Sequence, residues 1–200
     1  MAKKYYAVRI GRTPGVYDTW DACKAMTQGY PGAVYKSFTD IEEATVFYMG
    51  KEQQVLSTDA ELKEPYAFVD GSFNSVDNVY GYGGFLMANG TKYILQGSGK
   101  ESHLLEMDNV AGEIAGAMAA VEKAIELGLT ELNIYYDYMG IEMWAIGDWK
   151  RNKKGTIAYY DFMQSVQGKI KVTFIKVKGH SGVDGNEEAD KLAKQAVGIE

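Results

Sequence analysis

The stretch that decides the fold is YAFVDGS, residues 66–72. Its first four residues, Tyr66–Val69, form a short apolar run that predicts a buried strand, and this run ends on Asp70. Residues 132–136 repeat the pattern, because they are largely apolar and are followed by Asp137. A carboxylate that closes a buried strand needs a cation, a hydrogen-bond donor or water beside it. Asp70 and Asp137 are therefore candidate functional residues.

Beyond this stretch, two further strands are expected before the first helix, and helices and strands follow. Asn89-Gly90 is a strong hairpin signal and joins the expected strands Tyr80–Met87 and Tyr93–Gln96. A last strand is expected over Ile170–Val177. Apolar spacing and capping residues predict four helices: from Asn109 to just before Gly128, Met139–Trp149, Thr156–Gln167, and one that begins after Asp184. This order predicts an α/β fold with a mixed five-stranded sheet and flanking helices.

The first fifty residues predict a smaller unit with three strands and two helices. The expected elements are strands over Tyr5–Ile10, Val16-Tyr17 and Ala33–Phe38, a helix from the cap Thr19 to about Ala25, and a helix from a capping box at Thr39 and Glu42 to about Met49. Residues 51–65 are mostly polar and end at a proline. We therefore expect a three-stranded α+β domain at 1–50, a linker at 51–65 and the α/β domain at 66–200.

Charge separates the two parts of the chain. The formal net charge of the 200 residues is −6, which by itself argues against a nucleic-acid binder. Residues 1–38, however, hold six basic and two acidic residues, a charge of +4, whereas residues 51–200 hold 15 basic and 22 acidic residues, a charge of −7. A basic, tyrosine-rich head thus precedes an acidic body.

Composition also excludes some classes of protein. The single cysteine, Cys23, excludes a disulfide framework and a multi-thiolate zinc site, and we expect it to be buried. No apolar run approaches the roughly 18 residues of a membrane span, and the N-terminal lysines are not followed by the apolar segment of a secretory signal. We expect a cytoplasmic monomer with no membrane contact and no obligate protein partner.

Two further acids extend the pattern of Asp70 and Asp137. Glu113 lies in the first turns of the long helix expected from Asn109, and Asp190 lies one turn after Asn186 on the last helix. Converging acids repel one another unless a divalent cation neutralises them, and oxygen-only ligation favours Mg²⁺ or Mn²⁺ over zinc. The alternative is chance, since the chain has 27 acids and some will fall at strand ends.

The body resembles the type 1 ribonuclease H family over essentially all of residues 66–200. The matching segments are FVDGS at 68–72, NVAGE at 109–113, IYYD at 134–137, VKGHSG at 177–182 and NEEAD at 186–190. This resemblance implies an endoribonuclease that cleaves the RNA strand of RNA–DNA hybrids and leaves 5′-phosphate and 3′-hydroxyl ends. It implies two Mg²⁺ ions, with Mn²⁺ as an alternative, held by Asp70, Glu113, Asp137 and Asp190.

The same resemblance assigns further residues. It makes His180 the mobile catalytic histidine, for proton transfer or product release, and places Ser72 and Asn109 against the hybrid. For Asn109 a helix cap is an equal alternative, because Asn favours caps. Asp70 is the expected bridge between the two ions, and Glu113 can approach the 2′-hydroxyl that separates RNA from DNA.

The head resembles the small hybrid-binding (viroplasmin-like) domain that precedes many such nucleases. The matching segments are YYAVRIGR at 5–12, GVY at 15–17, TW at 19–20, Cys23 and YKSF at 35–38. The resemblance implies that the aromatic residues Tyr6, Trp20 and Tyr35 pack on the DNA strand and that Arg12 and Lys36 contact phosphate. Ser37 departs from it, because relatives often carry a second lysine there. The alternative for Trp20 is a place in the core of the small domain.

Two other functions fit part of the pattern. One is a noncatalytic hybrid-binding protein, and the other is a different nuclease or a transposase with the same fold. All four acids and His180 are present, which favours the enzyme, and the VKGHSG segment disfavours the transposase. Some relatives carry a long basic helix and loop between the residues that match Asp137 and His180, whereas here the cations of this interval are concentrated at 150–154, which resembles a shortened form. We therefore expect hybrid binding to depend on the head.

Overall fold

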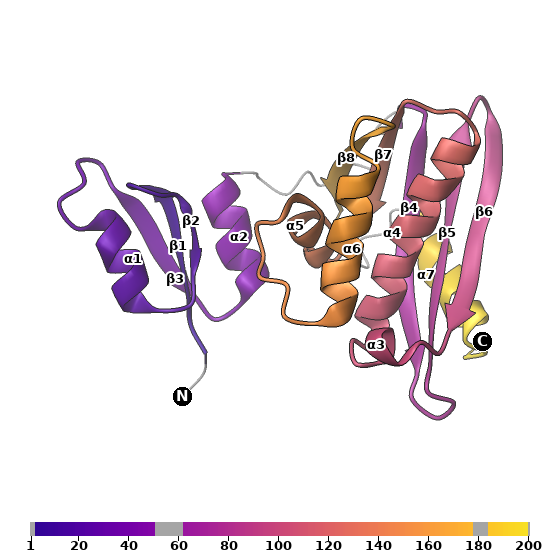
Figure 1. Cartoon of the computed structure of the whole chain (residues 1–200), viewed down its shortest axis with the longest axis horizontal. Coiled ribbons are helices and arrows are strands. Elements are labelled where there is room, and N and C mark those ends of the chain that lie inside the picture. Colours follow the sequence, from indigo (N-terminus) through magenta and orange to yellow (C-terminus); the bar gives the residue numbers. More distant parts are fainter. Residues whose placement is uncertain (1–2, 51–61, 178–183, 200) are drawn as a thin grey trace. The chain divides into compact units, whose positions relative to one another are not determined.

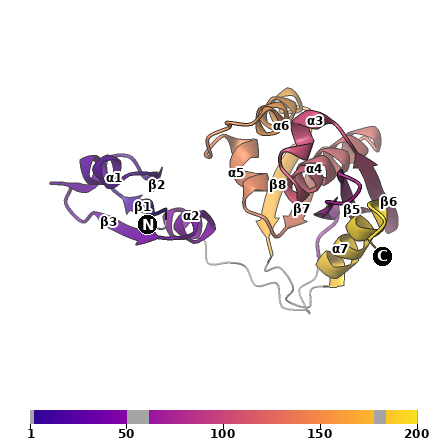
Figure 2. The same ribbon diagram turned by 90° about the horizontal axis from the view of Figure 1, so that it is seen from below.

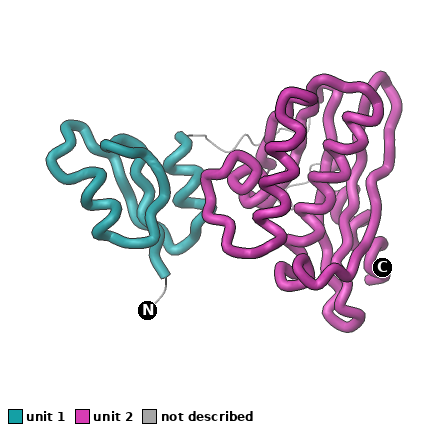
Figure 3. Tube along the Cα trace, in the orientation of Figure 1, with its two compact units in different colours: residues 1–54 teal, residues 55–200 magenta. Residues whose placement is uncertain are grey.

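The computed structural model describes residues 3–50, 62–177 and 184–199. The chain divides into two compact units, residues 1–54 and 55–200 (Figure 3). None of the described helices combines the length and the apolar character that crossing a bilayer requires.

The first unit is a three-stranded antiparallel sheet with two helices. Its elements are β1 (Tyr5–Ile10), β2 (Gly15–Tyr17), α1 (Trp20–Thr27), β3 (Val34–Phe38) and α2 (Ile41–Met49), and the strand order is β2-β1-β3. Because Tyr6 pairs with Ser37 and Val8 pairs with Tyr35, these four side chains share one face of the sheet. Lys36 pairs with Ala7 and lies on the other face.

The caps of the two helices differ from the expectation in one case. Thr19 caps α1 as expected, since its hydroxyl accepts a hydrogen bond from the Ala22 amide at 3.3 Å. Asp40, and not Thr39, caps α2, because its Oδ1 accepts hydrogen bonds from the amides of Glu42 and Glu43 at 2.6 and 3.0 Å. A carboxylate that accepts from two amides at a helix N-terminus is a stronger cap than a hydroxyl.

The second unit is built on a mixed five-stranded sheet, which confirms the expected fold class (Figure 1). The strands are β4 (Tyr66–Asn74), β5 (Val79–Ala88), β6 (Thr91–Gly99), β7 (Glu131–Tyr136) and β8 (Lys171–Lys176), in the order β6-β5-β4-β7-β8. The first three strands form an antiparallel meander, and β7 and β8 are parallel to β4.

One strand is longer than its apolar run. Asp70 was expected to end its strand, but β4 continues for four residues beyond it and pairs with β5 as far as Asn74, which pairs with Val79. The hairpin partner supplies ladder hydrogen bonds where the apolar pattern has already stopped. Asp70 therefore lies inside a strand, where its backbone is held on the side of β5.

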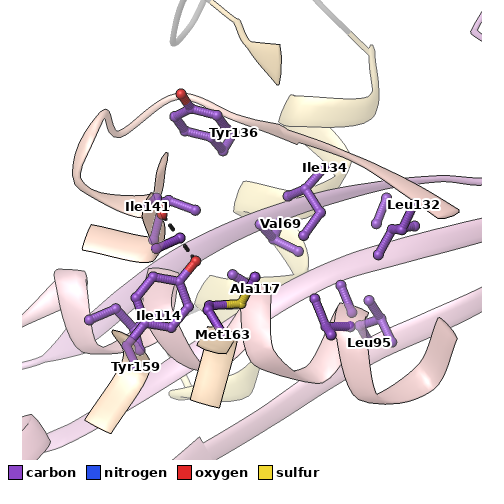
Figure 4. Close-up of a cluster of buried hydrophobic side chains, with 14 of the residues drawn as sticks. Val69, Leu95, Ile114, Ala117, Leu132, Ile134, Tyr136, Ile141, Tyr159 and Met163 are labelled. Atoms are coloured by element: carbon purple, nitrogen blue, oxygen red, sulfur yellow. Dashed lines mark hydrogen bonds between the residues drawn. The ribbon is translucent and has the colours of Figure 1, made fainter. Parts of the chain in front are cut away.

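Among the described residues of this unit, five helices flank the sheet: α3 (Ser102–Leu105), α4 (Asn109–Glu126), α5 (Gly140–Ile146), α6 (Lys154–Ser165) and α7 (Asp184–Ala196). Only α3 was not expected. The larger core lies between the sheet and α4, α5 and α6, whereas α7 covers the other face over Phe68, Phe85 and Tyr135 (Figure 2). In the larger core, the buried hydroxyl of Tyr159 on α6 donates a hydrogen bond to the Ile141 carbonyl on α5 at 3.1 Å (Figure 4).

Glycines bring α4 close to the sheet. A Cβ added to Gly71 on β4 would lie 2.3 Å from the Asn109 carbonyl oxygen, and one added to Gly112 on α4 would lie 2.0 Å from the Gly81 carbonyl oxygen. Any larger residue at either position would push the helix away from the sheet. This contact sets the position of Glu113, the next residue on α4, relative to Asp70, the residue before Gly71.

Candidate active site

Three carboxylates from three elements meet at one place. Asp70 lies in β4, Glu113 in the second turn of α4, and Asp137 directly after the last residue of β7. One carboxylate oxygen of each lies within 4.8 Å of the others. The parallel pairing of Phe68 with Tyr135 explains part of this, because the same register carried two residues further sets Asp70 beside Asp137.

Burial of this cluster makes its charges costly. Asp70 is 9% exposed and Glu113 is 3% exposed, and their carboxyl groups are hydrogen-bonded to each other. Burial and the charge of Asp137 raise the pKa of Asp70 to about 6, although the Gly71 amide donates a 2.7 Å hydrogen bond to its Oδ1. Burial, Asp70 and Asp137 raise the pKa of Glu113 well above its usual range.

The cluster fits a divalent cation. Oε2 of Glu113 is buried and has no hydrogen-bond partner among the described residues. A buried acceptor without a donor is costly, and so is a group of close carboxylates, whereas a bound cation satisfies both. Carboxylate oxygens alone are the donor set that Mg²⁺ or Mn²⁺ prefers.

The fourth predicted acid, Asp190, is not one of the three carboxylates that meet among the described residues. It lies on α7, is partly buried, and its Oδ2 accepts a 2.8 Å hydrogen bond from Lys194. Its charge still contributes to the raised pKa of Asp70, so Asp190 borders the cluster. His180 lies outside the described residues.

The two residues predicted to meet the hybrid beside these acids are accessible. Ser72 follows Asp70 by two residues and is partly exposed, and Asn109 is exposed one turn before Glu113. The alternative that Asn109 caps its helix is wrong, because Asp108 occupies the cap position and Asn109 is the first helical residue. The side chain of Asn109 therefore has no capping role.

A cavity of about 310 Å³ is lined in part by Tyr138, the residue after Asp137. Its apolar wall is formed by Met107, Val110, Tyr138 and Trp144. Its polar wall is formed by Lys150, Asn152, Lys153 and Thr156. Sequence reasoning noted the cations at 150–154 but missed the cavity, because its residues in α4, α5 and α6 come together only in the fold.

In the first unit, the three predicted aromatic residues form a continuous ring cluster. The Trp20 ring centroid lies 5.7 Å from that of Tyr6 and 5.9 Å from that of Tyr35. Trp20 and Tyr35 are 43% and 47% exposed, so the alternative that Trp20 is a core residue is wrong. Cys23 is fully buried, as expected.

The two predicted phosphate contacts of the first unit are engaged elsewhere. Nη1 of Arg12 donates hydrogen bonds to the carbonyl oxygens of Ala25 and Gln28 at 3.0 and 2.8 Å, and so holds the end of α1. Nζ of Lys36 lies 5.1 Å from the centroid of the Phe38 ring, on the face of the sheet opposite to Tyr35. Their contact with phosphate stays a prediction.

Comparison with known families gives two matches along the chain. A family model described as "RNase H" matches residues 63–198, and one described as "Ribonuclease H1 N-terminal domain" matches residues 4–48. Ribonuclease H1 of Mus musculus is 30% identical and that of Homo sapiens is 29% identical. In both cases the alignment covers 96% of this chain and 88% of the relative.

Solved structures show the same fold. RNase H1 from the halophilic archaeon Halobacterium salinarum NRC-1 has a TM-score of 0.53 at 20% identity, and the match covers 68% of this chain and 98% of that chain. LC11-RNase H1, solved in complex with an RNA/DNA hybrid, has a TM-score of 0.52 at 13% identity and covers 67% and 99%. At these identities the likeness establishes the fold alone.

Proposed function

The chain belongs to the RNase H family of hydrolytic nucleases, and we propose from this that it is an endoribonuclease that cleaves the RNA strand of RNA–DNA hybrids. The observation that carries the proposal is the cluster of Asp70, Glu113 and Asp137. Asp70 and Glu113 are buried, and one carboxylate oxygen of each of the three residues lies within 4.8 Å of the others. A noncatalytic hybrid-binding protein has no need of three converging carboxylates, two of them buried, because such a group destabilises the fold.

Asp70, Glu113 and Asp137, with Asp190 at the border, would hold two Mg²⁺ ions, with Mn²⁺ as an alternative. Bound there, the ions would supply an activated water and stabilise the leaving 3′ oxygen. The chain's part is to fix the carboxylates before the hybrid arrives: the Gly71 amide holds Oδ1 of Asp70, and the contact between Gly71 and Gly112 holds Glu113. Breaking the bond between phosphorus and the 3′ oxygen leaves 5′-phosphate and 3′-hydroxyl ends.

Asn109 and Ser72, together with Glu113, are proposed to face the minor groove of the hybrid, where the 2′-hydroxyl distinguishes RNA from DNA. His180 is proposed to transfer a proton or to assist product release. Both assignments follow the family resemblance, and the accessibility of Asn109 and Ser72 supports the first.

The cavity lined by Tyr138, Lys150 and Lys153 is proposed to receive a backbone phosphate of the hybrid. Lys150 and Lys153 bring positive charge to it, and Thr156 and Asn152 bring hydrogen-bond donors. The body as a whole carries a charge of −7, so this local group of cations is what allows an acidic unit to approach a polyanion.

Residues 1–50 are proposed as the hybrid-binding domain, 51–65 as the linker and 66–200 as the catalytic domain. The ring cluster of Tyr6, Trp20 and Tyr35 supports the first assignment, because exposed rings offer stacking surface to sugars and bases. Arg12 and Lys36 are proposed to add phosphate contacts. We further propose a monomer that needs no protein partner and acts in the cytoplasm, a reducing compartment that suits the single Cys23.

One assay tests the proposed activity. A hybrid with a labelled RNA strand is incubated with the full chain in Mg²⁺, in Mn²⁺ and in EDTA, beside matched double-stranded RNA and double-stranded DNA. We expect cleavage of the hybrid alone, in the presence of either metal, with products that carry 5′-phosphate ends. Binding of the hybrid without cleavage in both metals would show a noncatalytic binding protein, and cleavage of double-stranded DNA would show a different nuclease.

A further inference from the structure

Asp137 lies just beyond the part of β7 that the sheet holds. The strand ends at Tyr136, whose carbonyl accepts the Val177 amide at 2.8 Å. No ladder hydrogen bond follows along β7 in the described residues. The backbone of Asp137 is therefore less restrained than that of Asp70, which lies within a paired strand. Something other than the sheet has to hold Asp137 in the cluster.

Lys176 holds the backbone of Asp137. It is the last residue of β8 and pairs with Tyr136. Its Nζ donates a 2.6 Å hydrogen bond to the Asp137 carbonyl oxygen, in a partly buried position. A charged donor on a backbone carbonyl makes a short, strong hydrogen bond.

Asn186 holds the side chain of the same residue. It lies in the first turns of α7 and is 4% exposed. Its Nδ2 donates a 3.3 Å hydrogen bond to Oδ2 of Asp137. Its Oδ1 is buried and has no hydrogen-bond partner among the described residues. The side-chain amide of Asn186 therefore donates to the Asp137 carboxylate, although its own oxygen has no donor among the described residues and this is energetically costly.

We propose that Lys176 and Asn186 are positioning residues that hold Asp137 in the metal-binding geometry, Lys176 through the backbone and Asn186 through the carboxylate. The inference rests on the proposed function, because it assumes that the three acids bind Mg²⁺. Partners in this position fix the orientation of metal ligands, and their loss typically costs about 10- to 100-fold in metal affinity.

The charge of Lys176 gives this role an unusual signature. Lys176 contacts one residue of the carboxylate cluster. A lysine that acted there only through its positive charge would repel Mg²⁺, so its removal would strengthen Mg²⁺ binding. A positioning lysine has the opposite effect, because its removal frees Asp137. The sign of the change in Mg²⁺ affinity therefore separates the two roles.

The experiment is a calorimetric titration of the full chain with Mg²⁺ in the absence of hybrid. Lys176→Met removes the donor and keeps the apolar stem, and Lys176→Arg keeps a cationic donor. Lys171→Met removes the same charge from the exposed first residue of the same strand and is the matched control. We expect Mg²⁺ affinity to fall about tenfold in Lys176→Met, to be largely restored in Lys176→Arg and to be unchanged in Lys171→Met.

Cleavage kinetics and a second variant test whether Lys176 acts on the hybrid instead of on the metal site. We expect Lys176→Met to raise the Mg²⁺ concentration for half-maximal cleavage about tenfold and to leave the KM for hybrid unchanged. A raised KM for hybrid at normal Mg²⁺ affinity would make Lys176 a substrate-binding residue and would overturn the proposal. Asn186→Ala should weaken Mg²⁺ binding in the same direction, which keeps the test valid if Lys176→Met does not fold.

Nuclear magnetic resonance relaxation of the metal-free chain separates this inference from the proposed function. We expect the backbone of Asp137 and Tyr138 to become more mobile in Lys176→Met and to be unchanged in Lys171→Met. A wild-type chain that binds no Mg²⁺ would overturn the proposed function, and the relaxation data would still decide whether Lys176 holds Asp137. Equal or tighter Mg²⁺ binding by Lys176→Met, or an unchanged backbone at Asp137, would overturn the inference.

Discussion

Trp20 and Tyr35 in the first unit are 43% and 47% exposed, whereas Asp70 and Glu113 in the second are 9% and 3% exposed. Folded proteins usually show the reverse, with large aromatic residues mostly buried and acids mostly at the surface. The first unit leaves apolar rings in water, where they can cover a nucleic-acid strand, and the second removes carboxylates from water, where they can hold cations. We therefore expect affinity and turnover to be separable by mutation.

The strongest test of this separation is Asp70→Asn. It should lower hybrid cleavage by about 1,000-fold or more, because metal coordination supplies several kcal/mol of transition-state stabilisation. Hybrid affinity measured by fluorescence anisotropy in EDTA should stay within about twofold of wild type. Asp161→Asn, which removes an exposed acid of α6, is the charge-matched control. Substantial activity of Asp70→Asn at saturating Mg²⁺ would remove Asp70 from the site.

The same variant should be more stable than wild type in the absence of metal. The pKa of Asp70 is raised from 3.8 to about 6, which means that the fold favours the neutral carboxyl group. Its contribution to the free energy of unfolding is therefore greatest below pH 4 and is lost as the pH rises through 6. At pH 8 this loss is about 3 kcal/mol, roughly 100-fold in the unfolding equilibrium.

Chemical denaturation in EDTA at pH 4 and at pH 8 measures this effect. Asp70→Asn should exceed wild type in its free energy of unfolding at pH 8, and the difference should shrink toward pH 4. Added Mg²⁺ should stabilise wild type far more than the variant. A variant that is less stable than wild type at pH 8 would show that the acids do not oppose one another in the fold.

Deletion of residues 1–50 tests the other half of the separation. The remaining chain should fold and cleave, but its hybrid affinity should fall at least about tenfold, because a base that no longer stacks on an aromatic ring costs about 1–3 kcal/mol. The salt dependence of binding should flatten by about one unit for each phosphate group that the shortened chain no longer neutralises. If the truncated chain binds hybrid as tightly as the full chain at every salt concentration, the first unit is not a hybrid-binding domain.

Trp20→Ala should reproduce part of that loss in the intact chain, by about fivefold in hybrid affinity, with cleavage at saturating hybrid unchanged. Tyr30 is 38% exposed and lies outside the ring cluster, so Tyr30→Ala is the matched control. A circular-dichroism melt has to accompany the binding assay, because Trp20 is still more than half buried. Equal affinity of the two variants would remove the ring cluster from the binding surface.

The smallest expected effect is a gain. Ser37 shares a face of the first sheet with Tyr6 and Tyr35, so Ser37→Lys adds a cation on the side of the ring cluster. We expect hybrid affinity to rise about two- to threefold, and the slope of log affinity against log salt concentration to steepen by about one unit. Lys36 lies on the opposite face, and Lys36→Ala should therefore cost less than Ser37→Lys gains. If Lys36→Ala instead changed hybrid affinity more than Ser37→Lys, the phosphate-binding cations would lie on the face of the sheet that carries Phe38.

Sequence pattern predicted the residues of the candidate site better than their surroundings. Asp70, Asp137 and Glu113 were identifiable because each closes an apolar run or opens a helix, and these signals are local. The pairing of Asp190 with Lys194 was not predicted, although a spacing of four residues on a helix permits it. Lys176 gave no signal, because only the register of β7 and β8 sets it beside Asp137.

The fold departed from prediction where tertiary contacts replace local pattern. β4 extends past Asp70 because β5 pairs with it. The cavity exists because Trp144 of α5 and Thr156 of α6 come together with Met107, which lies between α3 and α4. The cap of α2 was misplaced by one residue, since Thr39 and Asp40 are both capping residue types and only the geometry distinguishes them. Arg12 was expected at phosphate, but one of its nitrogens holds the end of α1.

The close approach of Gly71 to Gly112 has a consequence for how this enzyme family could be retuned. The distance between Asp70 and Glu113 is set by two side chains that are only hydrogen atoms, because any methyl group there would meet the opposing backbone. The spacing of the ions that Asp70 and Glu113 are proposed to bind would therefore depend on the absence of side-chain atoms at Gly71 and Gly112. Under the proposed function, one carbon atom added at Gly112 would push α4 away from the sheet, separate Glu113 from Asp70 and so change the size of the cation that the pair prefers.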